Sequence, residues 1–238
     1  IGKIGNDETG QFFEEDMKRN NINTFLYRSV NDSGRAMALV SPDSERTFAT
    51  YLGAAVELSG EDIISPVFNG FGYFYVEGYL ISNKELFEKS LRIAKEQGLK
   101  TCVDLASYNI VEQFRDILIP ILDKYVDIIF ANEDEAKALT GKEPEEALNE
   151  FAAISEIAIV KTGSKGSIIG NGDQKFYIPA NQVNSKDTTG AGDLYASGFI
   201  YGLIHGQALE VCGKMGTLVA GKVIEVIGAK LSNDKWKL

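Results

Sequence analysis

The chain has 238 residues, of which 44% are hydrophobic and 24% charged, as in an ordinary globular protein. Its formal net charge of −10 argues against duplex nucleic acid or a membrane surface as partner, since both attract a basic field. Two cysteines and one histidine are too few for a disulfide framework or a zinc site, so we expect a cytoplasmic protein. The chain length favours one large domain with a small appendage.

The first segment, IGKIGNDETG, is typical of a strand end followed by a turn, and it starts with Ile1 rather than Met. We therefore expect an amino-terminal portion to precede it. The next segment, QFFEEDMKRNNI, places Phe12, Phe13 and Met17 at helical spacing. This spacing predicts a helix directly after the turn.

Residues 24–51 contain three short alternating or aromatic-rich runs, TFLYRSV, GRAMALVSP and ERTFATYL. The turn signals NDSG and SPDSE separate them, which is typical of hairpin strands. We expect a small antiparallel sheet over residues 24–51, attached to a larger α/β body formed by residues 1–23 and 52–238.

From GYFYVEGYL onward, apolar strands alternate with amphipathic helices. KTCVDLA and VDIIFAN are typical of buried parallel strands, and NKELFEKSLRIAKEQG and IVEQFRDILIPILDKY have helical periodicity. This alternation predicts right-handed βαβ units in a mostly parallel sheet flanked by helices. Ligands bind beyond the carboxyl ends of such strands, so the loops after Asp104, Ala131 and Lys161 are the places to search.

Three more strands, EIAIVKTG, GSIIGNG and KFYIPA, are close enough in sequence to form a partly antiparallel edge. Two helices should complete the chain, one from about Gly190 and one over roughly residues 208–227. We see no internal repeat and no second independent domain.

The segment DTTGAGD, residues 187–193, stands directly before the first of these two helices. A glycine-rich loop at a helix N-terminus presents N–H groups and the positive end of the helix dipole to a phosphate or an oxyanion. The P-loop pattern is absent, and G-x-G-x-x-G fails because Tyr195 stands where the third glycine would be. Asp193 can serve as a base for a hydroxyl that attacks phosphorus, or it can simply cap the first turn.

DTTGAGD also matches the D-T-x-G-A-G-D signature of the ribokinase-like (PfkB-type) carbohydrate and nucleoside kinases. IGKIGNDETG resembles that family's G-x-x-G-x-D-x-x-G segment, and ANEDEA resembles its N-x-x-E motif. VKTGSKGS is similar to the strand and turn under the nucleotide, and VIEVIGA to the helix and turn near the adenine pocket. The resemblance covers nearly all of the chain and implies a ribokinase-like fold in which the small antiparallel sheet is a lid.

The resemblance also implies an activity, the ATP-dependent transfer of a phosphoryl group to a hydroxymethyl group of a sugar or nucleoside. In this comparison Asp193 matches the catalytic base. Gly190, Ala191 and Gly192 match the anion hole that stabilises charge on the phosphoryl group. Asp187, at the start of the loop, would hold that loop beside the nucleotide.

Two further groups of residues match cofactor positions in the family. Asn132 and Glu135 match residues that organise Mg²⁺ and the triphosphate, with Glu135 acting through water because magnesium usually retains several waters. Thr162, Gly163 and Gly166 match nucleotide contacts. Simpler structural roles remain open: Asn132 and Glu135 could form a capping box, and the two glycines a hairpin turn.

The acceptor is less well defined than the reaction. ERTFATYLGAAVEL resembles the arginine-led segment of adenosine kinases, in which Arg46 would approach the phosphates as the lid closes. Tyr108 falls near a position where an aromatic ring stacks on a nucleoside base, although it could equally pack in the protein. Adenosine is therefore the favoured acceptor, and a ribokinase-type or fructokinase-type sugar kinase is the alternative.

A third hypothesis is a catalytically silent nucleotide-binding protein of the same fold. It is motivated by the family's acceptor-binding aspartate and Gly-Gly segment, which would lie before Ile1. The resemblance leaves open a dependence on a monovalent cation. It also leaves open whether the protein is a monomer or a homodimer paired through its lids.

Overall fold

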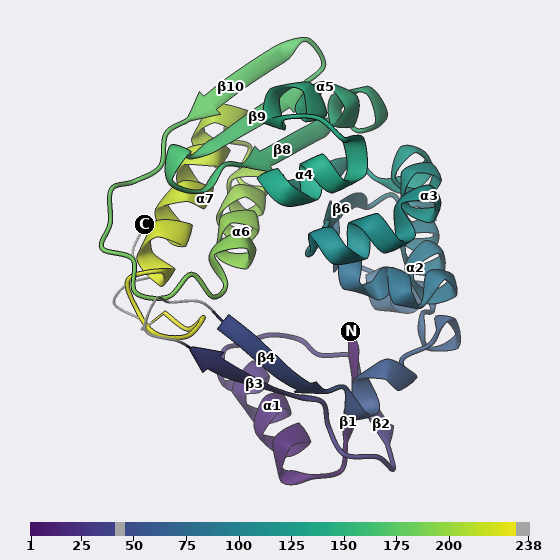
Figure 1. Cartoon of the computed structure of the whole chain (residues 1–238). Coiled ribbons are helices and arrows are strands. Elements are labelled where there is room, and N and C mark those ends of the chain that lie inside the picture. Colours follow the sequence, from purple (N-terminus) through teal and green to yellow (C-terminus); the bar gives the residue numbers. More distant parts are fainter. Residues whose placement is uncertain (41–45, 232–238) are drawn as a thin grey trace.

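The structure, a computed structural model, describes residues 1–40 and 46–231, and the side chains of Val40 and Arg46 lie outside the described part. Its centre is a six-stranded sheet in the order β10-β9-β8-β7-β6-β5 (Figure 1). The strands are β5 (Tyr73–Glu77), β6 (Lys100–Asp104), β7 (Ile128–Asn132), β8 (Ile157–Lys161), β9 (Ser167–Asn171) and β10 (Gln174–Ile178).

Strands β5 to β8 are parallel, and β9 and β10 extend the sheet as an antiparallel edge. The first four residues of β7 and of β8 are all buried, as expected for strands covered on both faces. Both the parallel strands and the antiparallel edge confirm the sequence prediction.

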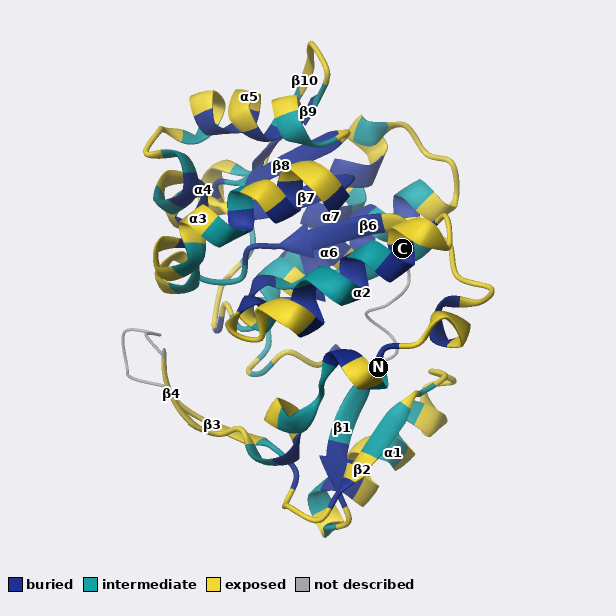
Figure 2. Cartoon of the chain, turned by 90° about the vertical axis from the view of Figure 1, so that its right-hand side faces the viewer, coloured by how far each residue is buried: buried dark blue, intermediate teal, exposed yellow. Residues whose placement is uncertain are grey.

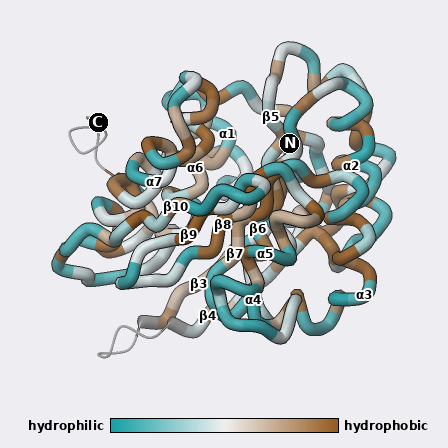
Figure 3. The backbone as a smooth tube through the Cα atoms, turned by 90° about the horizontal axis from the view of Figure 1, so that it is seen from above, coloured by the Kyte–Doolittle hydropathy of each residue, from teal (hydrophilic) through white to brown (hydrophobic). Residues whose placement is uncertain are grey.

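Helices cover both faces of this sheet. Val103 and Ile129 on one face pack with α2 (Lys84–Glu96), α3 (Tyr108–Tyr125), α4 (Glu133–Thr140) and α5 (Pro144–Ile154). Phe130 and Ile159 on the other face pack with α6 (Ala191–Ile204) and α7 (Leu209–Val223) (Figure 1). In Figure 3, hydrophobic segments run through the central strands and α6, and hydrophilic colour marks many outer turns.

The predicted helix of NKELFEKSLRIAKEQG is confirmed as α2. Its buried face includes the residues expected from the spacing, namely Leu86, Phe87, Ser90, Leu91 and Ala94. Gly98 follows its end with φ +80°, a conformation that glycine adopts without strain. The last helix is shorter than expected, because α7 ends at Val223.

The remaining elements form two small sheets. Strands β1 (Gly2–Gly5) and β2 (Leu26–Ser29) pair in parallel, and α1 (Glu8–Arg19) connects them along the chain. Strands β3 (Arg35–Val40) and β4 (Arg46–Tyr51) pair antiparallel. The small antiparallel sheet is therefore confirmed for β3 and β4, but the prediction that it also includes the TFLYRSV strand is wrong. The crossover helix α1 returns that strand beside β1, and short-range alternation does not identify a strand's partner.

These small sheets and α1 lie together at one end of the molecule (Figure 1), and β3 and β4 are largely exposed (Figure 2). Short 3-10 turns are η1 (Gly53–Glu57), η2 (Gly60–Asp62), η3 (Ser65–Phe68), η4 (Gly78–Ser82) and η5 (Gly163–Lys165). Within the described ranges, no helix combines the length and apolar character needed to cross a membrane.

Candidate active site

Four neighbouring strands bring polar side chains to one edge of the sheet. Glu77 and Asp104 end β5 and β6, and Asn132 and Lys161 end β7 and β8. The register pairs Glu77 with Asp104 and Asn132 with Lys161. This is the carboxyl edge of the parallel strands, where open α/β sheets bind their ligands.

The glycine-rich loop opens α6. Gly190 is the N-cap residue with φ +76°, and a Cβ there would lie 2.8 Å from the Cβ of Ala229. Asp193 lies in the first turn of α6. The N–H of Ala191 already donates to the Thr188 carbonyl at 3.2 Å, so Gly192 and Asp193 supply the first-turn N–H groups best suited to an anion.

Asp193 lies against a second carboxyl group. Its negative charge acts on the carboxyl group of Glu77, which ends β5. Burial raises the pKa of Glu77, and the negative charges of Asp193 and Asp104 raise it further, because adjacent carboxylates resist joint ionisation. The negative charge of Asp193 thus stands at the same edge of the sheet as the carboxyl groups of Glu77 and Asp104.

Lys161 supplies a positive charge in this cluster. Its Nζ donates to Asp104 Oδ2 at 2.6 Å, and the two side chains are 16% and 6% exposed. The same Nζ lies 3.2 Å from the position that a Cβ on Gly192 would occupy. Sequence reasoning identified Lys161 as a strand end without giving it a role and did not select Glu77. Both are charged residues that end apolar strands, and that was the available signal.

Asn132 and Glu135 form the capping box that was the simpler of their two expected roles. The Glu135 carboxylate accepts from the backbone N–H and the Nδ2 of Asn132, and the Glu135 N–H donates to Asn132 Oδ1, all at 2.8 Å. Burial raises the pKa of Glu135 to about 7, although the charge of Lys161 acts in the opposite direction.

The capping box limits how these residues could hold magnesium. Both carboxylate oxygens of Glu135 already accept hydrogen bonds, which suits contact through a water better than direct coordination. Over residues 1–40 and 46–231, no group of three or more His, Cys, Asp or Glu side chains is arranged to hold a metal ion. The donor set therefore fits a magnesium ion that arrives on phosphate oxygens and is held by the protein through water.

Thr162, Gly163 and Gly166 form the turn between β8 and β9. Thr162 is buried, and its N–H donates to the Gly166 carbonyl at 2.8 Å. Gly166 has φ +109°, and a Cβ there would lie 1.9 Å from the Ile178 carbonyl oxygen. The hairpin-turn role is thus present, and nucleotide contact by these residues remains a prediction.

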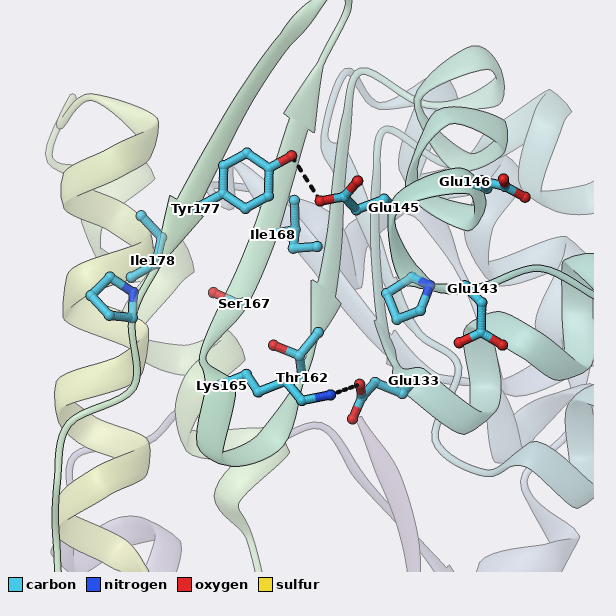
Figure 4. A pocket seen from close by; sticks show the side chains of 12 residues that line it. Glu133, Glu143, Glu145, Glu146, Thr162, Lys165, Ser167, Ile168, Tyr177 and Ile178 are labelled. Carbon is cyan, nitrogen blue, oxygen red and sulfur yellow. Dashed lines mark hydrogen bonds and ion pairs between the residues drawn. The ribbon is translucent and has the colours of Figure 1, made fainter.

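A pocket of about 740 Å³ lies on the α5 side of this turn (Figure 4). Thr162 and Lys165 line it, but neither the glycine-rich loop nor Asp193 does. Its wall carries four acidic side chains, which would repel a triphosphate; these are Glu133, Glu143, Glu145 and Glu146. The acidic lining makes this pocket a poor site for an anion.

The remaining site residues predicted from the sequence are Asp187, Tyr108 and Arg46. Asp187 is buried, with 4% exposure, and its carboxylate accepts from the N–H groups of Thr189 and Gly228. Tyr108 begins α3 in the loop region after β6 and is 49% exposed. Arg46 begins β4, and its side chain lies outside the described residues.

Comparison with known proteins gives consistent results. Residues 1–236 match the family model described as pfkB family carbohydrate kinase. The structure superimposes on adenosine kinase from Sinorhizobium meliloti with a TM-score of 0.90 and 35% identity, covering 97% of this chain and 73% of that chain. For a probable sugar kinase from Rhizobium etli CFN 42, the TM-score is 0.88 and the identity 36%, covering 99% and 74%.

A curated relative shows the same similarity in sequence. An uncharacterized sugar kinase from Archaeoglobus fulgidus is 28% identical over 236 residues, which is 97% of this chain and 92% of that protein. The family match spans the strands, the glycine-rich loop and the polar sheet edge described above. The chain therefore belongs to the pfkB family of carbohydrate kinases and is a sugar or nucleoside kinase with a ribokinase-like fold.

Proposed function

We propose that this kinase transfers the terminal phosphoryl group of ATP to a hydroxymethyl group of a nucleoside or sugar, with adenosine as the first candidate. The position of Asp193 carries this proposal: it lies in the first turn of α6, three residues after Gly190, and close to Glu77 at the carboxyl end of β5. A carboxylate beside an anion-binding loop would weaken phosphate binding unless it acts on the attacking group.

In the proposed reaction, Asp193 accepts the proton of the acceptor hydroxyl as its oxygen attacks the γ-phosphorus. A new oxygen–phosphorus bond forms, and the bond from that phosphorus to the bridging oxygen of ADP breaks. The loop of Gly190, Ala191 and Gly192 surrounds the phosphoryl group, and the first-turn N–H groups of Gly192 and Asp193 stabilise the negative charge.

Magnesium would be held by the phosphates and, through water, by Glu135 with Asn132. A bound Mg²⁺ neutralises part of the triphosphate charge. The capping box fixes the Glu135 carboxylate in one orientation, so a water bound to it would have a defined position. Thr162, Gly163 and Gly166 would lie along the nucleotide, and Asp187 would keep the loop in place.

The acceptor assignment rests on two observations. The S. meliloti structure at 35% identity is an adenosine kinase, and the exposed ring of Tyr108 at the start of α3 is available to stack on a base. The carboxyl group of Glu77 at the end of β5 suits the hydroxyls of a free sugar as well as those of a nucleoside's ribose. A ribokinase-type or fructokinase-type substrate therefore stays in the test.

We assign the role of a lid to residues 24–51, with β3 and β4 as its sheet. The loop that precedes α6 descends toward the end of the molecule that carries these strands (Figure 1). Closure would exclude water from the phosphoryl group and bring Arg46 toward the phosphates. Exposed Met37, Leu39 and Phe48 on this sheet suit either a lid that closes on its own body or one that pairs with a second copy.

An acceptor screen tests this function. The purified chain is incubated with Mg·ATP and adenosine, other nucleosides, ribose or fructose, in K⁺ and in Na⁺ buffers, and the product is identified by ³¹P NMR. We expect acceptor-dependent ADP release and a phosphomonoester on the hydroxymethyl oxygen, with adenosine the best acceptor. ATP binding without transfer to any acceptor would instead support the catalytically silent alternative.

A further inference from the structure

The environment of Lys161 is not explained by the roles described so far. Its ammonium and the Asp104 carboxylate form a 2.6 Å ion pair with little exposure to solvent. Removing both charges from water is unfavourable, and a pair of this kind is weak grounds for stability by itself. Within the part of the chain that the structure describes, the ammonium makes one hydrogen bond, to Asp104, and so has donors to spare.

Asp104 is held in place from its other side. Its Oδ1 accepts from the Ala106 N–H at 3.3 Å, and Ala106 has φ +66°, a conformation that is uncommon for a residue other than glycine. Such backbone strain concentrates at functional sites. Both carboxylate oxygens of Asp104 are therefore engaged, one by the turn and one by Lys161.

The ammonium borders the glycine-rich loop. The 3.2 Å separation between Nζ and the Cβ position of Gly192 leaves no room for another side chain between them. The carboxyl groups of Glu77 and Glu135 lie along the same edge. The positive charge of Lys161 acts to lower the pKa of both, against the raising effect of burial. A triphosphate approaching these acidic groups would be repelled, and a cation beside Gly192 offsets that repulsion.

We propose that Lys161 binds the transferred phosphoryl group together with the first-turn N–H groups of α6, and that Asp104 is the positioning residue that holds its ammonium at Gly192. This assignment rests on the proposed function, because it uses the same loop and the same phosphoryl group. The spare N–H donors of Lys161 make charge-assisted hydrogen bonds to phosphate oxygens, while Asp104 keeps the side chain extended across the strand ends.

The same turn offers a matched control. Lys165 lies four residues later, its side chain is 79% exposed, and its 3.5 Å ion pair is with Glu133 on the other side of the turn. Lys165→Met therefore removes the same charge without touching the loop. Lys161→Met removes the ammonium but keeps an unbranched side chain of similar length.

The test measures the affinity for the magnesium salts of the β,γ-imido analogue of ATP and of ADP by titration calorimetry. We expect Lys161→Met to weaken the analogue by about tenfold to a hundredfold and ADP by much less. Lys165→Met, which changes the turn but not the loop, should leave the preference for the analogue over ADP unchanged. Asp104→Asn should also reduce the preference for the analogue over ADP. In the double variant that carries both substitutions, the loss of affinity for the analogue should be smaller than the sum of the losses in the two single variants.

Equal losses for the analogue and ADP, or unchanged affinities in Lys161→Met, would overturn the assignment. If Lys161→Met does not fold, Lys161→Arg takes its place, and it should keep most of the preference for the analogue because it keeps the charge. If Lys161→Arg prefers the analogue over ADP no more than the uncharged Lys161→Gln does, a charge-based role is contradicted. A wild-type chain that prefers the analogue but phosphorylates no acceptor refutes the proposed function, and loss of that preference in Lys161→Met would then still show that Lys161 binds the terminal phosphate.

Discussion

The Asp187 carboxylate accepts a 2.8 Å hydrogen bond from the N–H of Gly228, which ties the start of the glycine-rich loop to a turn 41 residues further on. The other oxygen accepts from the Thr189 N–H at 2.9 Å. Asp187→Ala leaves these partly buried donors without the carboxylate, so the free energy of unfolding should fall by about 1–3 kcal/mol in urea titrations. The exposed Asp173→Ala should change it by less than about 0.5 kcal/mol, and equal effects would contradict the tie.

Gly192→Ala should separate catalysis from stability. The new methyl group would stand 3.2 Å from Lys161 Nζ, the far end of a flexible side chain, so the fold can adjust. Alanine is favoured over glycine in a helix by up to about 1 kcal/mol, and the melting temperature should stay level or rise. Turnover should fall by about tenfold to a hundredfold, because the phosphoryl group and the ammonium are displaced.

Gly190→Ala provides the contrast for that prediction. Its φ of +76° and the 2.8 Å approach to Ala229 make any side chain strained there. We expect a loss of about 1–2 kcal/mol in unfolding free energy in the same urea titration. Full activity in Gly192→Ala, with its fold intact, would show that the phosphoryl group lies elsewhere.

The raised pKa of Glu135 should appear in the pH dependence of stability. Burial raises this pKa from 4.5 to about 7, so the folded chain binds a proton that the unfolded chain has released between these values. The contribution of Glu135 to the free energy of unfolding therefore falls as the pH rises from 4.5 to 7, by at most about 3 kcal/mol. Urea titrations at pH 4.5, 5.5 and 7 check it.

Glu135→Gln is the comparison for the pH series. The amide cannot titrate, so the variant should lose part of the decline in stability that wild type shows between pH 4.5 and 7. Its absolute stability should also be lower, because an amide cannot accept both hydrogen bonds from Asn132. Identical slopes in the two proteins would mean that Glu135 titrates normally.

Much of the fold could be predicted from the sequence, because its strands and helices have clear periodicity. The strands β7 and β8 are largely apolar runs, and α2 buries one face at helical spacing. The location of β2 could not be predicted, since pairing with β1 depends on the crossover through α1 rather than on the strand's own residues.

The arrangement of the candidate site could be predicted where its residues are close in sequence. Gly190 and Asp193 stand in one loop and one helical turn, and Asn132 and Glu135 form a capping box within four residues. Lys161 was harder, because its partner Asp104 is 57 residues away along the chain. A lysine at a strand end is usually solvated, and only the register of β6, β7 and β8 brings it to Asp104 and Gly192.

The most direct test of the account is the turnover of Asp193→Asn with Mg·ATP and the best acceptor of the screen, measured as acceptor-dependent ADP release. Asparagine keeps the size of the side chain at this first-turn position, so the fold and nucleotide binding should be retained. Because the amide cannot take the hydroxyl proton, we predict a fall in kcat of about 10²-fold to 10⁴-fold. Turnover at the wild-type rate would contradict the role of Asp193 as the base.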